Sequence, residues 1–344
     1  VILTSIFIII GYIILNKEFQ TVRKVTAELL RMQKSKQLSL IDLSEAPNDD
    51  ITYMAASFNN LSSSVNNLLA TFQKFVSKDV VAKAYSDQVI NLEGKQRELT
   101  MLFSDIKSFT YRTETLGNDI IDVLNVHYDR VIHKVHLNNG VVGSIIGDAI
   151  LAVYGTLDSK MSKSYDAIRS AWDITRETAK LRDSMIARRK EIEQKRKLTE
   201  SEERVYQAVL LDVGVGIDGG NVFYGNIGSQ EHMANTVIGD TVNSASRLEG
   251  VTRVYHLPVI VSEYVKTEVE QESARYKFIE IDTIQVKGKT EGKKIFFPFD
   301  TNEMEEGLLE KYKQFESALY AYYEGDWKTA RKLFKETQLE VSEV

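Results

Sequence analysis

The spacing of apolar residues changes along the chain and divides it into segments. The first 15 residues, VILTSIFIIIGYIIL, are almost wholly apolar, and Lys17, Arg23 and Lys24 follow them closely. A bilayer crossing needs about 20 apolar residues. The segment therefore predicts a truncated transmembrane helix over residues 1–16, with the following residues on the cytoplasmic side. The tail of a signal peptide is the alternative, but no small-x-small cleavage site follows the apolar run.

Residues 17–70 carry apolar residues at alternating spacings of three and four. The first series is Val22, Val25, Leu29 and Met32. The second is Ile51, Met54, Phe58, Leu61, Val65 and Leu68, and it continues past residue 70 with Phe72 and Phe75. Such spacing makes an apolar seam that only a partner helix covers. We therefore expect two helices joined by a polar connector, a parallel dimer, and a helical linker over residues 71–94. A plain dimerisation stalk and a signalling module both fit this pattern.

Strand and helix patterns alternate between residues 95 and 298. We expect strands at 98–105, 206–218, 221–227, 258–262, 276–286 and 294–299, a hairpin at 141–154, and helices at 118–139, from 166, and at 240–254. Gly219-Gly220 is expected to join two of these strands, and the highly charged stretch 186–204 to form a solvated arm or loop. This order predicts an α+β sheet with helices on one face.

The last segment, residues 299–344, carries two helical patterns that meet at Gly325-Asp326, where Asp326 is placed as an N-cap. It resembles one tetratricopeptide-type helical hairpin. One such repeat cannot bury its own apolar face. We therefore expect this hairpin to pack on the main domain, on its dimer mate or on another protein.

Composition excludes several classes of protein. The formal charge of −6 argues against a nucleic-acid partner. The chain has no Cys, which excludes disulfides, thiolate metal sites and a Cys nucleophile.

Two aspartates stand where predicted strands end. Asp105 closes the strand at 98–105, and Asp148 lies in the turn of the hairpin. A Gly-Asp turn needs no function to explain it, so the turn alone leaves both interpretations open. If the strands are neighbours, the carboxylates converge and suit Mg²⁺ or Mn²⁺. The backbone N–H groups of the following turn, IKSFT at 106–110, suit phosphate, and the combination is typical of phosphoryl transfer.

Asn243 and Arg247 lie four residues apart on a helix expected to begin at Asp240, so they share one face. The forked cation of Arg247 matches phosphate geometry. Taken alone, Asp240 serves equally well as an N-cap and Arg247 as a partner of Glu249. Lys287 in VKGK likewise suits either phosphate or plain solvent.

Five segments follow one another in an order and at separations that resemble the class III nucleotide cyclases, the adenylyl and guanylyl cyclase family: LFSDIKSFT, IIGDAILAVYG, GVGIDGGNVFYGNIGS, VIGDTVNSASRLEG and VKGK. The resemblance covers residues 95–298 and implies a ferredoxin-like βαββαβ catalytic domain. Residues 17–70 resemble a HAMP signalling domain through DDITYMAASFNNL, although the usual proline is missing and Asp50 replaces the usual Glu.

The resemblance implies a role for each motif. Asp105, Asp148 and the carbonyl of Ile106 would bind two Mg²⁺ or Mn²⁺ ions per site. The phosphate-binding turn would consist of Lys107, Ser108, Phe109 and Thr110, with Ser108 in place of the family's usual Gly. Asn243 would position the ribose, Arg247 would stabilise charge at the α-phosphate, and Lys287 would contact the terminal phosphates. In this family each site is shared by two catalytic domains, so a monomer would be inactive.

The base-reading positions implied by the resemblance are Ser144 and Thr236. Typical adenylyl cyclases have Lys at the first and guanylyl cyclases have Glu. Hydroxyl groups both donate and accept hydrogen bonds, so this pair specifies a purine weakly. The absence of an acidic residue at 144 favours ATP over GTP.

The sequence thus predicts a membrane-anchored adenylyl cyclase in the plasma (inner) membrane, with a cytoplasmic catalytic domain that dimerises and is regulated through the HAMP-like module. A degenerate cyclase domain that binds nucleotide or transmits a signal is one alternative, and a cyclase with relaxed ATP/GTP selectivity is another.

Overall fold

The computed structural model describes residues 2–35, 37–44, 46–72, 94–229, 233–285, 292–303 and 307–337. The chain separates into two compact units, Val1–Asn91 and Leu92–Val344, and each has its own hydrophobic cluster. The predicted linker at 71–94 lies almost entirely outside the described residues.

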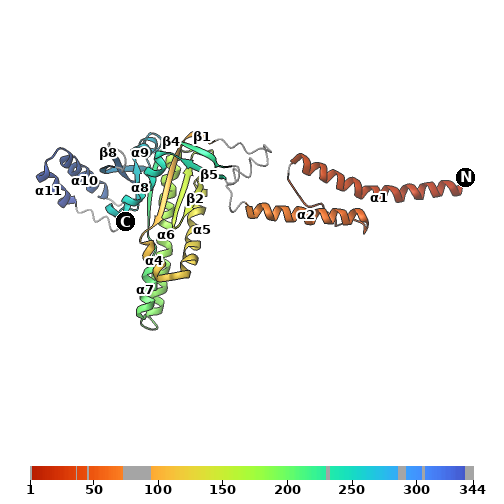
Figure 1. Ribbon diagram of the computed structural model, residues 1–344, viewed down its shortest axis with the longest axis horizontal. Coiled ribbons are helices and arrows are strands. Elements are labelled where there is room, and N and C mark those ends of the chain that lie inside the picture. Colours follow the sequence, from red (N-terminus) through yellow and green to blue (C-terminus); the bar gives the residue numbers. More distant parts are fainter. Residues whose placement is uncertain are drawn as a thin grey trace. The chain divides into compact units, whose positions relative to one another are not determined.

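In its described residues the N-terminal unit contains two helices, α1 (Ile2–Ser35) and α2 (Asp50–Phe72), joined by an extended connector (Figure 1). Its buried cluster contains Val25, Met32, Ile41 and Ala55. The side-chain amide of Asn59 binds the connector at both backbone groups of Ile41, at 2.8 and 2.9 Å. The predicted pair of helices with a connector is therefore confirmed, whereas the HAMP assignment stays a prediction.

An apolar stripe of α2 faces solvent. Met54, Leu61 and Leu68 are each more than half exposed and follow one another every seven residues, which is the spacing of an unpaired coiled-coil seam. Nowhere in the described residues does a helix combine the length and the hydrophobicity that a bilayer crossing requires. The transmembrane helix predicted over residues 1–16 is not confirmed.

The second unit is built on one mixed sheet with the strand order β2-β3-β1-β4-β6-β8-β7, and β5 extends it by pairing with β4 (Figure 1). The strands are β1 (Lys95–Ile106), β2 (Val141–Ile146), β3 (Ala149–Tyr154), β4 (Val213–Gly228), β5 (Met233–Ile238), β6 (Val259–Ser262), β7 (Tyr276–Gln285) and β8 (Gly292–Asp300). The first four strands lie in the order β2-β3-β1-β4 with antiparallel neighbours. With helices between β1 and β2 and between β3 and β4, this is the predicted βαββαβ arrangement.

Strand β4 differs from the prediction, because it runs unbroken through Gly219-Gly220 and pairs with β1 from Val213 to Tyr224. The glycines are there for close packing. A Cβ at Gly216 would lie 2.1 Å from the backbone nitrogen of Glu249, and one at Gly219 would lie 2.3 Å from the ring of Tyr264. A strand that alternates Val and Gly therefore packs valines on one face and a helix backbone closely on the other.

The helices cover both faces of the sheet, not one as predicted. On one face α5 (Ile120–Leu137), α6 (Lys163–Glu193) and α9 (Glu263–Glu272) cover the main core. On the other face α8 (Asp240–Tyr255) rests against Gly214 and Gly216 of β4. This arrangement places α8 beside β1 as well.

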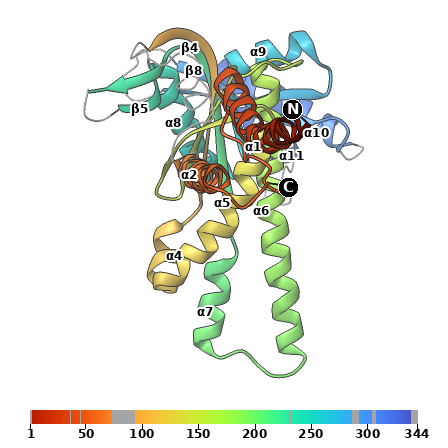
Figure 2. The ribbon, with the colours of Figure 1, turned by 90° about the vertical axis from the view of Figure 1, so that its right-hand side faces the viewer.

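The charged stretch predicted as an arm or loop is a helical hairpin. Figure 2 shows α6 and α7 (Glu200–Val209) side by side, extending beyond the sheet, with α4 (Phe109–Leu116) next to α7. Thr199 and Glu202 form a capping box at the start of α7. Arg189 of α6 pairs with Glu203 of α7 at 3.0 Å and joins the two helices, and Arg196 of the connecting turn pairs with Glu202 at 2.6 Å.

The C-terminal hairpin consists of α10 (Leu308–Tyr323) and α11 (Trp327–Thr337), and Asp326 accepts a hydrogen bond from the backbone N–H of Thr329, as an N-cap does. The ring of Tyr312 stacks on Phe299 of β8 with 5.4 Å between centroids. Of the three surfaces expected to bury this hairpin, the sheet of its own unit does so. The tetratricopeptide likeness stays a prediction.

Candidate active site

The carboxylates of Asp105 and Asp148 converge, as the sequence predicts. β1 and β3 are antiparallel neighbours with Ser104 opposite Ile150, which brings the end of β1 beside the turn between β2 and β3. Asp105 and Asp148 are close enough for their side chains to hydrogen-bond one another. Asp148 therefore lies beside a second carboxylate at the end of the sheet, a position that a plain hairpin turn does not require.

The electrostatics of the pair favour a cation. Burial first, and then the neighbouring Asp105, raise the pKa of Asp148 to about 6, while the backbone of Ile106 moves it partly back. The Oδ2 atom of Asp148 is buried without a hydrogen-bond partner in the described structure. The nearby Tyr128 donates to the carbonyl of Gly147, and burial followed by the two aspartates raises its pKa to about 12.

Arg253 of α8 is a residue of this site that sequence reasoning missed. Its Nη2 lies 2.6 Å from Oδ2 of Asp105, and its Nη1 lies 2.8 Å from Oε1 of Glu249. Burial raises the pKa of Glu249 to about 7, against the effect of Arg253. The spacing of Glu249 and Arg253 indicates a helical ion pair, but nothing local shows that the same guanidinium reaches Asp105, 148 positions earlier.

The residues present fit a divalent cation. Two adjacent carboxylates and one orphaned buried oxygen are the hard donors that Mg²⁺ and Mn²⁺ prefer. No three His, Asp or Glu side chains gather as a metal cluster anywhere in the described ranges, so this site offers two carboxylates and a backbone carbonyl. Asp105 and Asp148, with the carbonyl of Ile106, would hold the ion or ions.

The turn after β1 is formed as expected, with one correction. The backbone N–H of Lys107 donates to the carbonyl of Asp212 at 2.8 Å, and Nζ of Lys107 lies 2.9 Å from Oδ2 of Asp212. The N–H group and the side chain of Lys107 therefore both bind Asp212, which removes Lys107 from the predicted phosphate-binding turn. The N–H groups suited to an anion are those from Ser108 into the first turn of α4, because they have no acceptor within the helix. Ser108 has φ 58° and ψ 38°, a left-handed conformation that favours glycine.

Asn243 and Arg247 lie on α8, which begins at Asp240 as predicted. Both side chains are exposed. Arg247 and Arg253 are six positions apart, which turns them about 120° from each other around the helix. Because Arg253 faces Asp105, Arg247 faces away from it. Asn243 lies ten positions before Arg253, about 15 Å along the helix. Within one chain the structure therefore does not bring the predicted Asn-Arg pair to the aspartates.

The predicted base-reading residues lie on two strands that contact each other, Ser144 on β2 and Thr236 on β5. Both are partly exposed. Lys287 lies outside the described residues. Strand β5, which carries Thr236 and leads into α8, was not predicted from the sequence.

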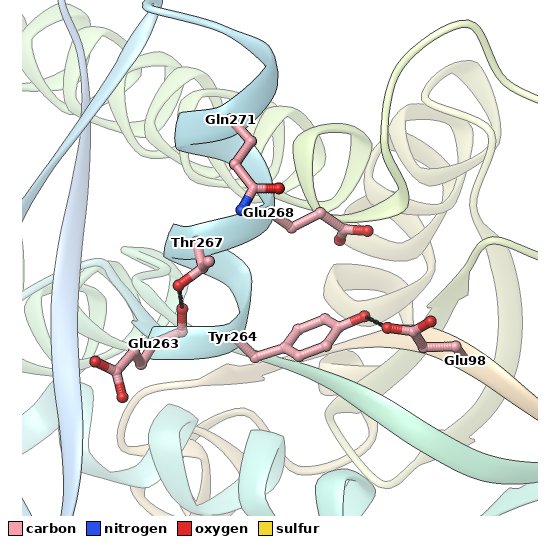
Figure 3. A pocket seen from close by; sticks show the side chains of 6 residues that line it. All are labelled: Glu98, Glu263, Tyr264, Thr267, Glu268 and Gln271. Atoms are coloured by element: carbon pink, nitrogen blue, oxygen red, sulfur yellow. Dashed lines mark hydrogen bonds between the residues drawn. The ribbon is translucent and has the colours of Figure 1, made fainter.

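A separate cavity of about 510 Å³ opens between α9 and β1 (Figure 3). Its lining includes Glu98, Tyr264 and Glu268, and the hydroxyl of Tyr264 donates to Glu98. Lys163 pairs with Glu268 and neutralises part of this acidic lining. Glu98 is seven residues before Asp105 on β1, about 23 Å along an extended strand, so this cavity is distinct from the aspartate site.

Comparison with known families gives one match that covers more than half of the chain. The sequence model described as "Adenylate and Guanylate cyclase catalytic domain" matches residues 93–299. These residues include Asp105, Asp148, Asn243 and Arg247.

Two curated relatives are adenylate cyclases. One from Dictyostelium discoideum, described as terminal-differentiation specific, is 25% identical over 249 residues, which are 71% of this chain and 11% of the relative. One from Anabaena cylindrica is 28% identical over 262 residues, which are 72% of this chain and 48% of the relative. The chain therefore spans about half the length of the second relative and far less of the first.

Solved structures give the same family of folds. A bacterial light-regulated adenylyl cyclase superposes with a TM-score of 0.58 at 25% identity, covering 73% of this chain and 66% of that one. The adenylyl cyclase CyaB from P. aeruginosa superposes with a TM-score of 0.50 at 22% identity, covering 62% of this chain and 98% of that one, and supports the fold alone.

Proposed function

The chain belongs to the family of adenylate and guanylate cyclase catalytic domains, and from that premise we propose that it converts ATP to cyclic AMP and pyrophosphate. The observation that carries this proposal is the convergence of Asp105 and Asp148 at the end of the sheet, beside a turn whose N–H groups suit phosphate. A degenerate domain would have no reason to keep two mutually repelling carboxylates together.

Divalent ions bound by this pair would neutralise the charge that develops on the phosphates during attack by the 3′-hydroxyl. The chain's own groups have separate tasks. Asp105 and Asp148 hold the cation, and the N–H groups from Ser108 onward bind phosphate oxygens. Arg247 matches the α-phosphate, and Asn243 orients the ribose by hydrogen bonding.

We propose that two copies of the chain share each site. Asn243 and Arg247 are exposed. Arg247 faces away from Asp105 of its own chain, and Asn243 lies about 15 Å along α8 from Arg253, which contacts Asp105. The aspartates of one copy would therefore meet the Asn-Arg pair of the other. The apolar stripe of Met54, Leu61 and Leu68 supports parallel pairing of two copies of α2. Membrane attachment of α1 and control through a HAMP-like module extend this proposal and rest on the sequence pattern.

We propose ATP as the preferred substrate, supported by the adenylate cyclase relatives and by the lack of an acceptor-only side chain at Ser144. Relaxed selectivity is the second candidate. The observation that favours it is the presence of hydroxyl groups at both Ser144 and Thr236, since hydroxyls accommodate the hydrogen-bonding edges of adenine and guanine alike.

The proposal is tested by chromatographic product analysis after incubating the 344-residue chain with Mn²⁺ and either ATP or GTP. An Asp148→Ala variant and an Asp122→Ala variant, altered at an exposed position of α5, are the matched pair. Cyclic AMP formed by the wild type and by Asp122→Ala, but not by Asp148→Ala, is the expected result. Absence of any cyclic product from a confirmed wild-type dimer would refute cyclase activity.

A further inference from the structure

Arg112 of α4 links two parts of the catalytic unit that are remote in sequence. Its side chain is only 7% exposed. Its Nε donates to the carbonyl of Lys107 at 3.0 Å, and its Nη1 donates to the carbonyls of Ala208 at 2.7 Å and Gln207 at 3.5 Å. One guanidinium therefore joins the phosphate turn to the end of α7.

The carbonyls at the end of α7 need such a partner. The last four carbonyls of a helix receive no hydrogen bond from an N–H group within the helix. A cation at that end is also stabilised by the helix dipole. Gln207 and Ala208 are among the last residues of α7, and Leu116, Ile120 and Ala208 form a small buried cluster around the contact. The end of α7 is thus a firm anchor for Arg112.

Arg112 also determines which way a neighbouring N–H points. In a trans peptide the carbonyl and the N–H point in opposite directions. Because the Lys107 carbonyl is held by Arg112, the N–H of Ser108 is directed away from α7. The preceding peptide is held separately, since the Lys107 N–H donates to Asp212, and the carbonyl of Ile106 is directed away from Asp212.

We propose that Arg112 is a positioning residue for nucleotide binding, which orients the Ser108 N–H toward the substrate phosphates by tying the Lys107 carbonyl to the end of the α6–α7 hairpin. This inference rests on the proposed cyclase function. On this proposal the α6–α7 hairpin helps to hold the phosphate-binding turn after β1 in place.

The test compares Arg112→Met, Arg112→Lys and a control, Arg204→Met, at an exposed position of α7. Each 344-residue chain is assayed for kcat and KM with ATP and Mn²⁺, for the Kd of α,β-methylene-ATP by calorimetry, and for Tm. Phosphate contacts form in the ground state as well as in the transition state, so their loss raises KM more than it lowers kcat.

For Arg112→Met we expect KM and the Kd of the analogue to rise about tenfold, with kcat within about threefold of wild type. Arg112→Lys, which keeps a donor to one carbonyl, should recover part of this loss. It also serves as the decisive variant if Arg112→Met does not fold.

Unchanged KM and Kd in a folded variant, or a fall confined to kcat and Tm, would overturn the positioning role. A wild-type chain that forms no cyclic product refutes the proposed function instead, and the Kd of the analogue still tests Arg112.

Discussion

The guanidinium of Arg253 lies against the carboxylate of Asp105, with 2.6 Å between Nη2 and Oδ2, and the same cation contacts Glu249 at 2.8 Å. It therefore partly neutralises a cluster of acidic groups that also includes Asp148. A divalent ion bound at the same oxygens would take over that task.

This contact predicts that a bound divalent ion and Arg253 stabilise the folded chain in the same way, by neutralising the acidic groups. Arg253→Met should lower the Tm of the metal-free chain, because the acidic groups then lose a neutralising cation. Addition of Mn²⁺ should raise the Tm of this variant by more than it raises the wild-type Tm. Thermal melts with and without Mn²⁺ measure both effects. Arg130→Met, altered at an exposed position of α5, should behave as wild type, and an equal Mn²⁺ effect in Arg253→Met would contradict the shared role.

A second prediction concerns the sharing of sites between two copies. Asp148→Ala and Arg247→Ala should each be inactive alone. Equal mixing should restore about a quarter of wild-type activity, because half of the dimers are mixed and each of these holds one intact site. Cyclic AMP formation before and after mixing measures this. An absence of recovery, with exchange of chains demonstrated by a tag, would show that each chain builds its site alone.

Replacement of Ser144 tests base selection. A Lys at this position only donates hydrogen bonds and therefore suits adenine N1. Ser144→Lys should increase the ratio of kcat/KM for ATP to that for GTP by about tenfold, as expected for one charge-assisted hydrogen bond. Ile145→Lys adds the same charge at the next position on β2, where the side chain is 47% exposed, and should leave the ratio unchanged. Equal ratios in both variants would remove Ser144 from base reading.

The left-handed backbone at Ser108 predicts a stabilising substitution. With φ at 58°, Ser108→Gly should raise the free energy of unfolding by roughly 0.5–1 kcal/mol, because glycine adopts this conformation without steric strain. Ser317→Gly, within α10, should have the opposite effect by a similar amount. Chemical denaturation measures both. A loss of stability in Ser108→Gly would indicate that the serine side chain outweighs the backbone strain.

His127 predicts a pH dependence of stability. It is 1% exposed, and burial lowers its pKa from 6.5 to about 4. Between these values the unfolded chain binds a proton that the folded chain does not, so stability is fully present above pH 6.5 and falls as pH decreases toward 4, by at most roughly 1.4 kcal/mol per unit. His127→Gln should flatten this part of the profile relative to the exposed control His133→Gln. Identical slopes in denaturation at several pH values would contradict it.

Much of the fold follows from local patterns. The hairpin at 141–154 and the start of the helix at Asp240 appear as predicted, because apolar alternation and turn residues act over a few positions. The prediction of a turn at Gly219-Gly220 was wrong because glycine serves two purposes. It permits turns, and it also lets a neighbouring group approach, as Tyr264 does here.

The sequence by itself determined which motifs the chain carries: Asp105, Asp148 and the turn at 106–110 predict phosphoryl transfer, and Asn243 and Arg247 join them through the resemblance to the cyclase family. The tertiary structure alone decided which groups meet: it joins Asp105 to Arg253 and Lys107 to Arg112 and the end of α7, and it turns Arg247 away from the aspartates. The reason is physical. Propensity and periodicity act between near neighbours in sequence, whereas these contacts depend on strand pairing, on the close approach that Gly216 allows α8, and on the charges that meet once the sheet has formed.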